Sequence, residues 1–141
     1  MKIASILANK GEFVATIAPD ATVADLLRLL AEHRIGAVLV TVDDSIIGVA
    51  SERDVARSLV SAGAIILDGP VSRIMSKLVA TCDLQTPVEE VMVLMTEQRV
   101  RHVPVLDADR LVGIVSIGDV VKARIEKLED ERKSLLSYIT S

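Results

Sequence analysis

The sequence predicts an α+β protein in which one small unit is built twice. A shift of the chain by 65 residues pairs residues 14–57 with residues 79–122 without a gap, and 14 of the 44 pairs are identical. About a third of the other pairs exchange one aliphatic residue for another, so the two copies share much of one pattern of apolar positions. Self-similarity at a fixed offset is the signature of repeated structure, and we therefore interpret the two segments as copies of one fold unit.

Each copy contains the same order of expected elements. A short apolar run at residues 13–17 or 78–82 is typical of a strand, and apolar residues at helical spacing follow, starting at Val23 in the first copy. Two further apolar runs, separated by turn-forming residues around Asp44, are typical of a hairpin. A second helix is expected after the hairpin. The predicted order is strand, helix, strand, strand, helix.

Segments outside the paired region extend this plan. Short helices are expected directly before each copy, at residues 3–8 and 71–75, and a long helix is expected at residues 119–139. The long helix carries apolar residues in steps of three and four. We interpret this stripe as packing against its own unit, with a seam against a second chain as the alternative. The expected parts are a first repeat with its leading helix at residues 1–66, a second repeat at 67–127 and a helical extension at 128–141.

Composition excludes several classes of function. The chain has one Phe, one Tyr, no Trp and a net charge of -4, which disfavours nucleic-acid binding because that needs clustered cations and stacking surfaces. No cluster of metal ligands, no phosphate-binding loop with Lys and no nucleophile with an evident base is present, so we expect neither a metal site nor catalysis. Cys82 is the only cysteine and is interpreted as a small buried hydrophobe. With no apolar run long enough to span a bilayer, we expect a cytoplasmic protein without a membrane partner.

The motif that carries chemistry is Gly-x-x-Ser-x-x-Asp, which ends the hairpin of each copy. It places Ser51 and Asp54 in the first copy, and Ser116 and Asp119 in the second, where a strand gives way to a helix. One interpretation is a helix cap, in which the Ser hydroxyl and the acid satisfy backbone amides of the first turn. The other is a ribonucleotide site, because a carboxylate can accept two ribose hydroxyls while a Ser hydroxyl and a helix start suit a phosphate. The two roles are compatible.

Basic residues near the two motifs differ between the copies. Arg101 and His102 precede a strand of the second copy, where the first has Gly36 and Ala37. Arg53 stands beside the acid of the first copy. A phosphate contact and a solvated or structural role stay open for each of these three side chains, so two unequal sites, or one working site, are both consistent with the sequence.

These residues, in this order and duplicated, resemble the cystathionine-β-synthase (CBS) domain, and the chain is similar to a tandem pair of such domains, a Bateman module. The resemblance covers the chain from Ile3 to about Lys127 and rests on the repeated Gly-led motif, the Arg-His-Val-Pro-Val strand and the short leading helices. It implies two βαββα repeats packed with pseudo-two-fold symmetry, adenosine-containing ligands bound in clefts between the repeats, and a homodimer.

Carried onto matching positions, the resemblance implies three kinds of contact. Asp54 and Asp119 would bind riboses, and Ser51, Ser116, Arg101 and His102 would lie near phosphates. Base contacts would lie at the openings of the first strands and beside them, at Val14, Thr16, Val79, Thr81 and Pro104.

The function expected from these observations is a non-enzymatic regulatory module with a role in energy sensing. AMP or ATP is the first expected ligand, with ADP, NAD or S-adenosylmethionine as further members of the class, and no catalytic cofactor is expected. The ligand would change the packing of the repeats and so signal to a regulated protein that the sequence does not identify. The alternative is a ligand-free interaction module with vestigial sites.

Overall fold

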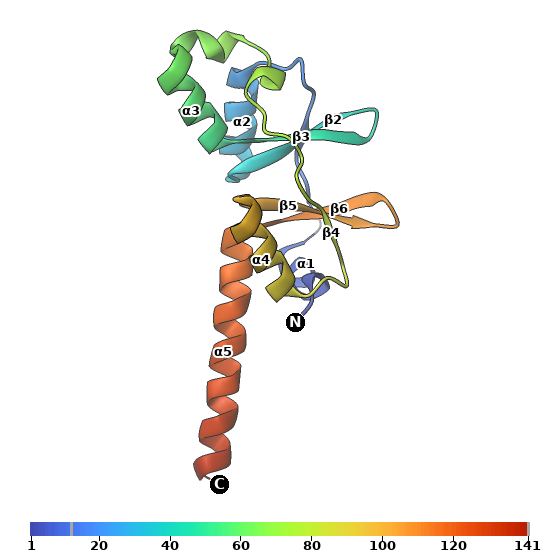
Figure 1. Cartoon of the computed structure of the whole chain (residues 1–141), viewed down its shortest axis with the longest axis vertical. Coiled ribbons are helices and arrows are strands. Elements are labelled where there is room, and N and C mark those ends of the chain that lie inside the picture. The colour runs from blue at the N-terminus through green and yellow to red at the C-terminus, as the bar shows by residue number, and fades with distance from the viewer. Residues whose placement is uncertain (12, 141) are drawn as a thin grey trace. The chain divides into compact units, whose positions relative to one another are not determined.

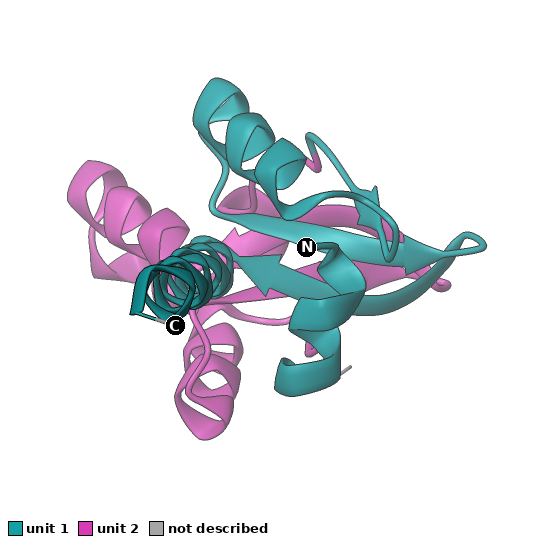
Figure 2. Cartoon of the chain, turned by 90° about the horizontal axis from the view of Figure 1, so that it is seen from below, with its two compact units in different colours: residues 1–13, 79–141 teal, residues 14–78 magenta. Residues whose placement is uncertain are grey.

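The computed structural model describes residues 1–11 and 13–140, and it divides into two compact units. Unit 1 contains residues 1–13 and 79–141, and unit 2 contains residues 14–78. Figure 1 shows the elements along the chain and Figure 2 colours the two units. Each unit holds one of the two sequence copies, as the repeat predicts.

Unit 2 is built around a three-stranded sheet of order β1-β2-β3. Its elements are β1 (Thr16–Ile17), α2 (Val23–His33), β2 (Ala37–Val42), β3 (Ser45–Ser51), α3 (Glu52–Ala62) and the 3-10 turns η1 (Ala64–Asp68) and η2 (Val71–Arg73). Strand β1 is parallel to β2, whereas β3 is antiparallel to β2. The core consists of aliphatic side chains that include Val23, Leu26, Val38 and Val71.

Unit 1 repeats this plan with a sheet of order β4-β5-β6. Its elements are α1 (Ile3–Lys10), β4 (Cys82–Asp83), α4 (Val88–Gln98), β5 (His102–Asp107), β6 (Arg110–Ser116) and α5 (Ile117–Thr140). The core joins Ile3, Leu7, Val91, Val103 and other apolar side chains of the unit. The predicted order of strands and helices is confirmed in both copies, although β1 and β4 each have two residues where runs of five were expected.

The hairpin turns follow from positive backbone angles. Asp43 and Asp44 have φ of 49° and 66°, and Ala108 and Asp109 have φ of 49° and 64°. Two consecutive residues with positive φ form the type I′ turn, whose twist matches that of the paired strands. Asp tolerates this region of backbone space better than most residues, which explains the turn-forming composition.

The leading segments, residues 3–10 and 71–76, do not pack with the copy that follows them in the chain. Each belongs to the unit that holds the other copy. Helix α1 belongs to unit 1 with the second copy, and η2 belongs to unit 2 with the first. The amides of Ile3 and Ala4 donate to the carbonyls of Thr86 and Leu84, which ties α1 to the segment before α4. The expected grouping of residues 1–66 is therefore corrected.

The glycines of the repeated motif explain how a leading segment fits against each hairpin. A Cβ atom on Gly113 would lie 2.8 Å from both terminal carbons of Leu7 in α1. A Cβ atom on Gly48 would lie 2.8 Å from the sulfur of Met75 and 2.9 Å from the carbonyl oxygen of Ser76. A side chain at Gly48 would collide with backbone, so β3 needs glycine there, whereas at Gly113 it would collide with the end of the Leu7 side chain, which can move.

Candidate functional site

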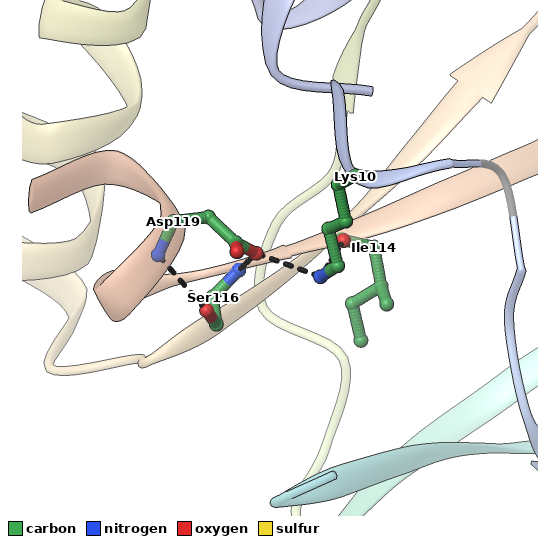
Figure 3. Close-up of polar contacts among 4 residues, drawn as sticks. All are labelled: Lys10, Ile114, Ser116 and Asp119. Atoms are coloured by element: carbon green, nitrogen blue, oxygen red, sulfur yellow. Dashed lines mark hydrogen bonds and ion pairs between the residues drawn. The ribbon is translucent and has the colours of Figure 1, made fainter. Parts of the chain in front are cut away.

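The second copy forms a polar junction where β6 passes into α5, shown in Figure 3. Oδ2 of Asp119 accepts hydrogen bonds from the backbone N–H of Ser116 at 2.8 Å and from Nζ of Lys10 at 2.7 Å. The Ser116 hydroxyl accepts the backbone N–H of Asp119 at 3.1 Å, which completes a capping box. Within residues 1–11 and 13–140, no donor contacts Oδ1 of Asp119. Half of this carboxylate is thus free to accept another hydrogen bond.

The charge of Asp119 is set by two opposing influences. Burial raises the pKa of the carboxyl, but the hydrogen bond from Lys10, the backbone N–H of Ser116 and the positive charge of Lys10 together lower it below its ordinary value. Asp119 is therefore ionised at neutral pH. An ionised carboxylate accepts stronger hydrogen bonds than a neutral oxygen, and the Asp119 side chain is still 24% exposed.

The equivalent junction of the first copy is closed. Oδ2 of Asp54 accepts the backbone N–H of Ser51 at 3.0 Å and the Ser51 hydroxyl at 2.9 Å, and Oδ1 accepts the Ser76 hydroxyl at 2.7 Å. Both carboxylate oxygens are occupied and the residue is only 8% exposed. A ribose hydroxyl that binds Oδ1 of Asp54 would have to share that oxygen with the Ser76 hydroxyl or displace it.

The difference between the two junctions comes from the leading segments. Extending the 65-residue offset upstream pairs Lys10 with Met75 and Gly11 with Ser76. Ser76 supplies the hydroxyl that fills Oδ1 of Asp54, whereas Gly11 has no side chain to fill Oδ1 of Asp119. Sequence analysis missed Lys10 and Ser76 as contacts of the two acids. The upstream extension of the repeat points to these two positions, although it does not indicate which acid each of them contacts.

A pocket of about 450 Å³ lies beside Asp119 within unit 1. Helices α1 and α5 line it with Ile6, Asn9, Lys10, Asp119, Lys122, Ala123 and Glu126. Its volume lies in the range of sites for small molecules. The two lysines supply positive charge, so the pocket offers both an acceptor and cations to an anionic ligand.

The other expected contacts of unit 1 lie near one edge of its sheet. Because β4 is parallel and β6 antiparallel to β5, the starts of β4 and β5 meet the end of β6 at that edge. Arg101 is exposed there, and its carbonyl accepts the N–H of Ile117 at 2.8 Å. His102 is half-buried and pairs with Ser116 across the ladder. The remaining three positions are Val79 and Thr81, both exposed, and Pro104, which is buried.

In unit 2 the expected contacts surround the closed acid. Val14 is half-buried, Thr16 is exposed at the start of β1, and Arg53 is exposed in the first turn of α3. The N–H of Leu39 donates to the carbonyl of Ala15 at 3.2 Å. Pro104 occupies the equivalent position in unit 1 and has no N–H, so the carbonyl of Ala80 lacks the corresponding partner.

Cys82 lies in the core of unit 1, where its thiol donates to the Pro104 carbonyl at 3.7 Å. Burial, and then the charge of Asp83, raise the pKa of the thiol to about 11. At pH 8 only about one thiol in a thousand is then ionised, compared with roughly a quarter for an exposed cysteine of ordinary pKa.

We expect Cys82 to react with a chromogenic disulfide reagent about a hundredfold more slowly in the folded protein than in urea, because the thiolate is the reactive form. A Ser137→Cys variant, with the new thiol on the exposed part of α5, provides the matched control and should react rapidly in the folded state. Equal folded-state rates for Cys82 and the introduced cysteine would contradict this assignment.

Neither metal binding nor a membrane span finds support in the described part of the chain. It holds no group of three or more His, Cys, Asp or Glu side chains placed to bind a metal ion. None of its helices is long and apolar enough to cross a bilayer.

Comparison with known proteins identifies relatives of the chain. A family profile for the CBS domain matches residues 11–61 and 71–126. The mitochondrial CBS domain-containing protein CBSX3 of Arabidopsis thaliana is 35% identical over 126 residues, which are 85% of this chain and 61% of that protein. The chain thus spans less than two thirds of this relative's length.

Solved structures share the fold. The CBS-domain containing protein ATU1752 of Agrobacterium tumefaciens is 41% identical, with a TM-score of 0.84 over 88% of this chain and 99% of that one. The CBS domain pair of protein MJ0100, solved in complex with 5′-methylthioadenosine and S-adenosyl-L-methionine, is 23% identical with a TM-score of 0.77 over 90% of this chain and 98% of that one.

Proposed function

Because this chain belongs to the CBS-domain family and carries two copies of the domain, we propose that it is a regulatory, non-enzymatic module that binds an adenosine-containing ligand at the Asp119 junction. The observation that carries the proposal is the half-free, ionised carboxylate of Asp119 beside a pocket of about 450 Å³. AMP or ATP is the first expected ligand. The fold of MJ0100, solved with two adenosine compounds, supports the ligand class.

The ribose would be held by Asp119. Oδ1 accepts one hydroxyl of the sugar directly, and Oδ2 accepts the other if the Lys10 ammonium shifts away from it. Lys10 also donates to the carbonyl of Ile114 at 2.8 Å, so the ammonium keeps one partner when it releases the acid. Hydrogen bonds between a carboxylate and a diol are charge-assisted and select ribose over deoxyribose.

The phosphate would lie among donors that the second copy leaves available. The Ser116 oxygen accepts from the Asp119 amide, and a hydrogen bond from the Ser116 side chain also lowers the pKa of Asp119, so a phosphate oxygen would take the hydroxyl proton from that carboxylate. In the first copy the Ser51 hydroxyl already donates to Asp54. Lys10 and Lys122 line the pocket, and Arg101 is exposed near the same edge of the sheet.

The adenine ring would contact the start of β4. Pro104 leaves the Ala80 carbonyl without the backbone donor that Leu39 gives to Ala15 in the first copy. This carbonyl, which receives no donor from position 104 and lies beside exposed Thr81, can accept the exocyclic amine of adenine. Val79 adds apolar surface, since it is 52% exposed.

Regulation would follow from unequal binding to two arrangements of the molecule. A ligand that binds both arrangements equally shifts neither population. We propose that the favoured arrangement is recognised by a partner protein, in a cytoplasmic homodimer. Release of Lys10 from Asp119 is the change at the site that ligand binding would produce.

A structural role is the competing function, and Asp54 is the observation that favours it for the first copy. Its carboxylate accepts three hydrogen bonds from Ser51 and Ser76, which makes it a stabilising cap. We therefore assign ligand binding to the second copy and a structural role to the Asp54 junction.

The test is a thermal-shift screen with AMP, ATP, NAD and S-adenosylmethionine. A ligand at about 100 times its dissociation constant should add about 2.7 kcal/mol to the free energy of unfolding. The Asp119→Asn variant, which keeps the size of the side chain but loses its charge, should lose this gain.

Two controls sharpen the screen. The 2′,3′-dideoxy analogue of the active ligand should lose most of the shift, because it lacks the diol. The Asp54→Asn variant should keep a shift close to that of the unmodified protein. A screen in which no adenosine compound raises the melting temperature would contradict the proposal.

A further inference from the structure

Helix α5 carries a stripe of exposed apolar side chains that its own unit does not cover. Exposure is 46% for Val121, 51% for Ile125, 47% for Leu128, 63% for Leu135 and 75% for Ile139. Single exposed apolar residues are ordinary on a protein surface, but a continuous row along one helix marks an interaction surface. The expectation that this stripe packs against its own unit is therefore not supported.

The face of α5 that does pack against unit 1 lies on another side of the helix. Val120 and Ala123 are buried in the core of the unit. Lys127 donates to Oε1 of Glu89 in α4 at 3.2 Å, and Arg124 lies 3.6 Å from the same oxygen. These contacts fix the helix and leave the stripe facing away from them. Figure 1 shows the second half of α5 continuing beyond the other elements of its unit.

The stripe has the spacing of a coiled coil. Its steps of four and three place Ile125, Arg132 and Ile139 at the a positions of a heptad repeat, and Val121, Leu128 and Leu135 at the d positions. In a parallel coiled coil, isoleucine at a with leucine at d favours two strands over three or four. From Val121 to Ile139 the seam is about 27 Å long at the rise of an α-helix.

We propose that this seam binds a second copy of the same chain, as a parallel, in-register, two-stranded coiled coil. Charge complementarity supports this occupant. Arg132 at its a position would lie beside Glu131 of the partner subunit, which occupies the adjacent g position. Arg124 at g would face Glu129 of the partner subunit at e, so opposite charges meet on both sides of the seam.

Arg132 sets the register of the pair. A charged residue at one a position costs stability but penalises every arrangement that buries it against apolar residues. In an antiparallel pair an a residue packs against a d residue, so Arg132 would meet a leucine such as Leu128 and lose its acidic partner. The proposal does not depend on ligand binding, because no residue of the seam lies in the Asp119 pocket.

Cysteine cross-linking tests both the pairing and its direction. The variants Leu128→Cys and Leu135→Cys each place a thiol at a d position, where two parallel helices bring identical residues together. We expect each variant alone to form a disulfide-linked dimer in at least about half of the chains under mild oxidation, because the positions are adjacent within the pair. Ser137→Cys, at the outward f position, is the matched control and should cross-link at least about tenfold less.

Each other outcome overturns the proposal. Cross-linking at neither d position, or equal cross-linking of all three variants, would exclude the seam as an interface. Cross-linking at only one d position would exclude the parallel register. Sedimentation gives an independent measurement: Leu128→Asp should weaken dimerisation at least about tenfold without unfolding an exposed helix face, and an unchanged dissociation constant would contradict the model of pairing.

Discussion

Replacing Asp54 by alanine is expected to lower the free energy of unfolding by about 2 kcal/mol, because the change removes a helix cap and the acceptor of a part-buried hydrogen-bond network. Three donors would lose their partner: the Ser51 amide, the Ser51 hydroxyl and the Ser76 hydroxyl. Asp54 is only 8% exposed, whereas Ser51 is half-buried and Ser76 is exposed, so water can replace only part of the lost acceptor. Urea denaturation followed by circular dichroism measures the change.

Asp119→Ala is the matched control for this substitution. Asp119 caps α5 through the same backbone contacts, but its side chain is 24% exposed and one oxygen has no recorded partner within the described chain. We expect a smaller loss of about 1 kcal/mol, the typical value of a helix cap. Equal losses for the two variants would show that the junctions do not differ in the way the structure indicates.

Gly48→Ala is expected to lower the free energy of unfolding by about 2 to 3 kcal/mol, because the new methyl group overpacks a site bounded by backbone. Its Cβ would lie 2.9 Å from the Ser76 carbonyl oxygen. That carbonyl accepts the N–H of Val49 at 2.9 Å, and the Ser76 N–H donates to Val49 at 2.8 Å. Relief of the clash would therefore break a backbone bridge. Denaturant unfolding gives the measurement.

Gly113→Ala provides the comparison in the other unit. There the new Cβ would meet the terminal carbons of Leu7, which belong to a side chain and can move further than backbone can. We expect a loss of about 1 kcal/mol, the lower end of the range for overpacking. A larger loss at Gly113 than at Gly48 would contradict the assignment of the leading segments to the two units.

Most of the fold could be predicted from the sequence because its determinants are local. The period of the apolar residues predicts the helices and strands, Ser51 caps α3 as the motif indicates, and the turn composition around Asp44 matches a type I′ hairpin. The repeat then required both copies to share one topology. The residue propensities and the apolar pattern indicate the same helices and strands, so the secondary structure of such a chain can be predicted from its sequence.

The placement of the leading segments could not be predicted in this way. Lys10 reaches Asp119 across 109 residues of chain, and Ser76 reaches Asp54 across 22. Nothing in the apolar pattern of residues 3–10 specifies which copy they pack against, since both copies offer a glycine at the contact. The decision depends on tertiary packing, which single-sequence patterns do not encode.

The candidate site was predicted in outline but not in its asymmetry. Both acids stand at strand-to-helix junctions as the motif indicates, and both capping bonds form. Whether an acid also has a free oxygen depends on one residue of a leading segment, Ser76 in unit 2 and Gly11 in unit 1. Identical motifs thus have different chemistry because their surroundings differ.

The central claim is that the Asp119 junction, and not the Asp54 junction, binds an adenosine-containing ligand. Calorimetric titration of the unmodified chain with the ligand that gives the largest thermal shift tests this most directly. We predict one bound ligand per chain, unchanged stoichiometry for Asp54→Asn and no measurable binding for Asp119→Asn. Two bound ligands per chain, or binding that survives Asp119→Asn and is lost in Asp54→Asn, would contradict the account.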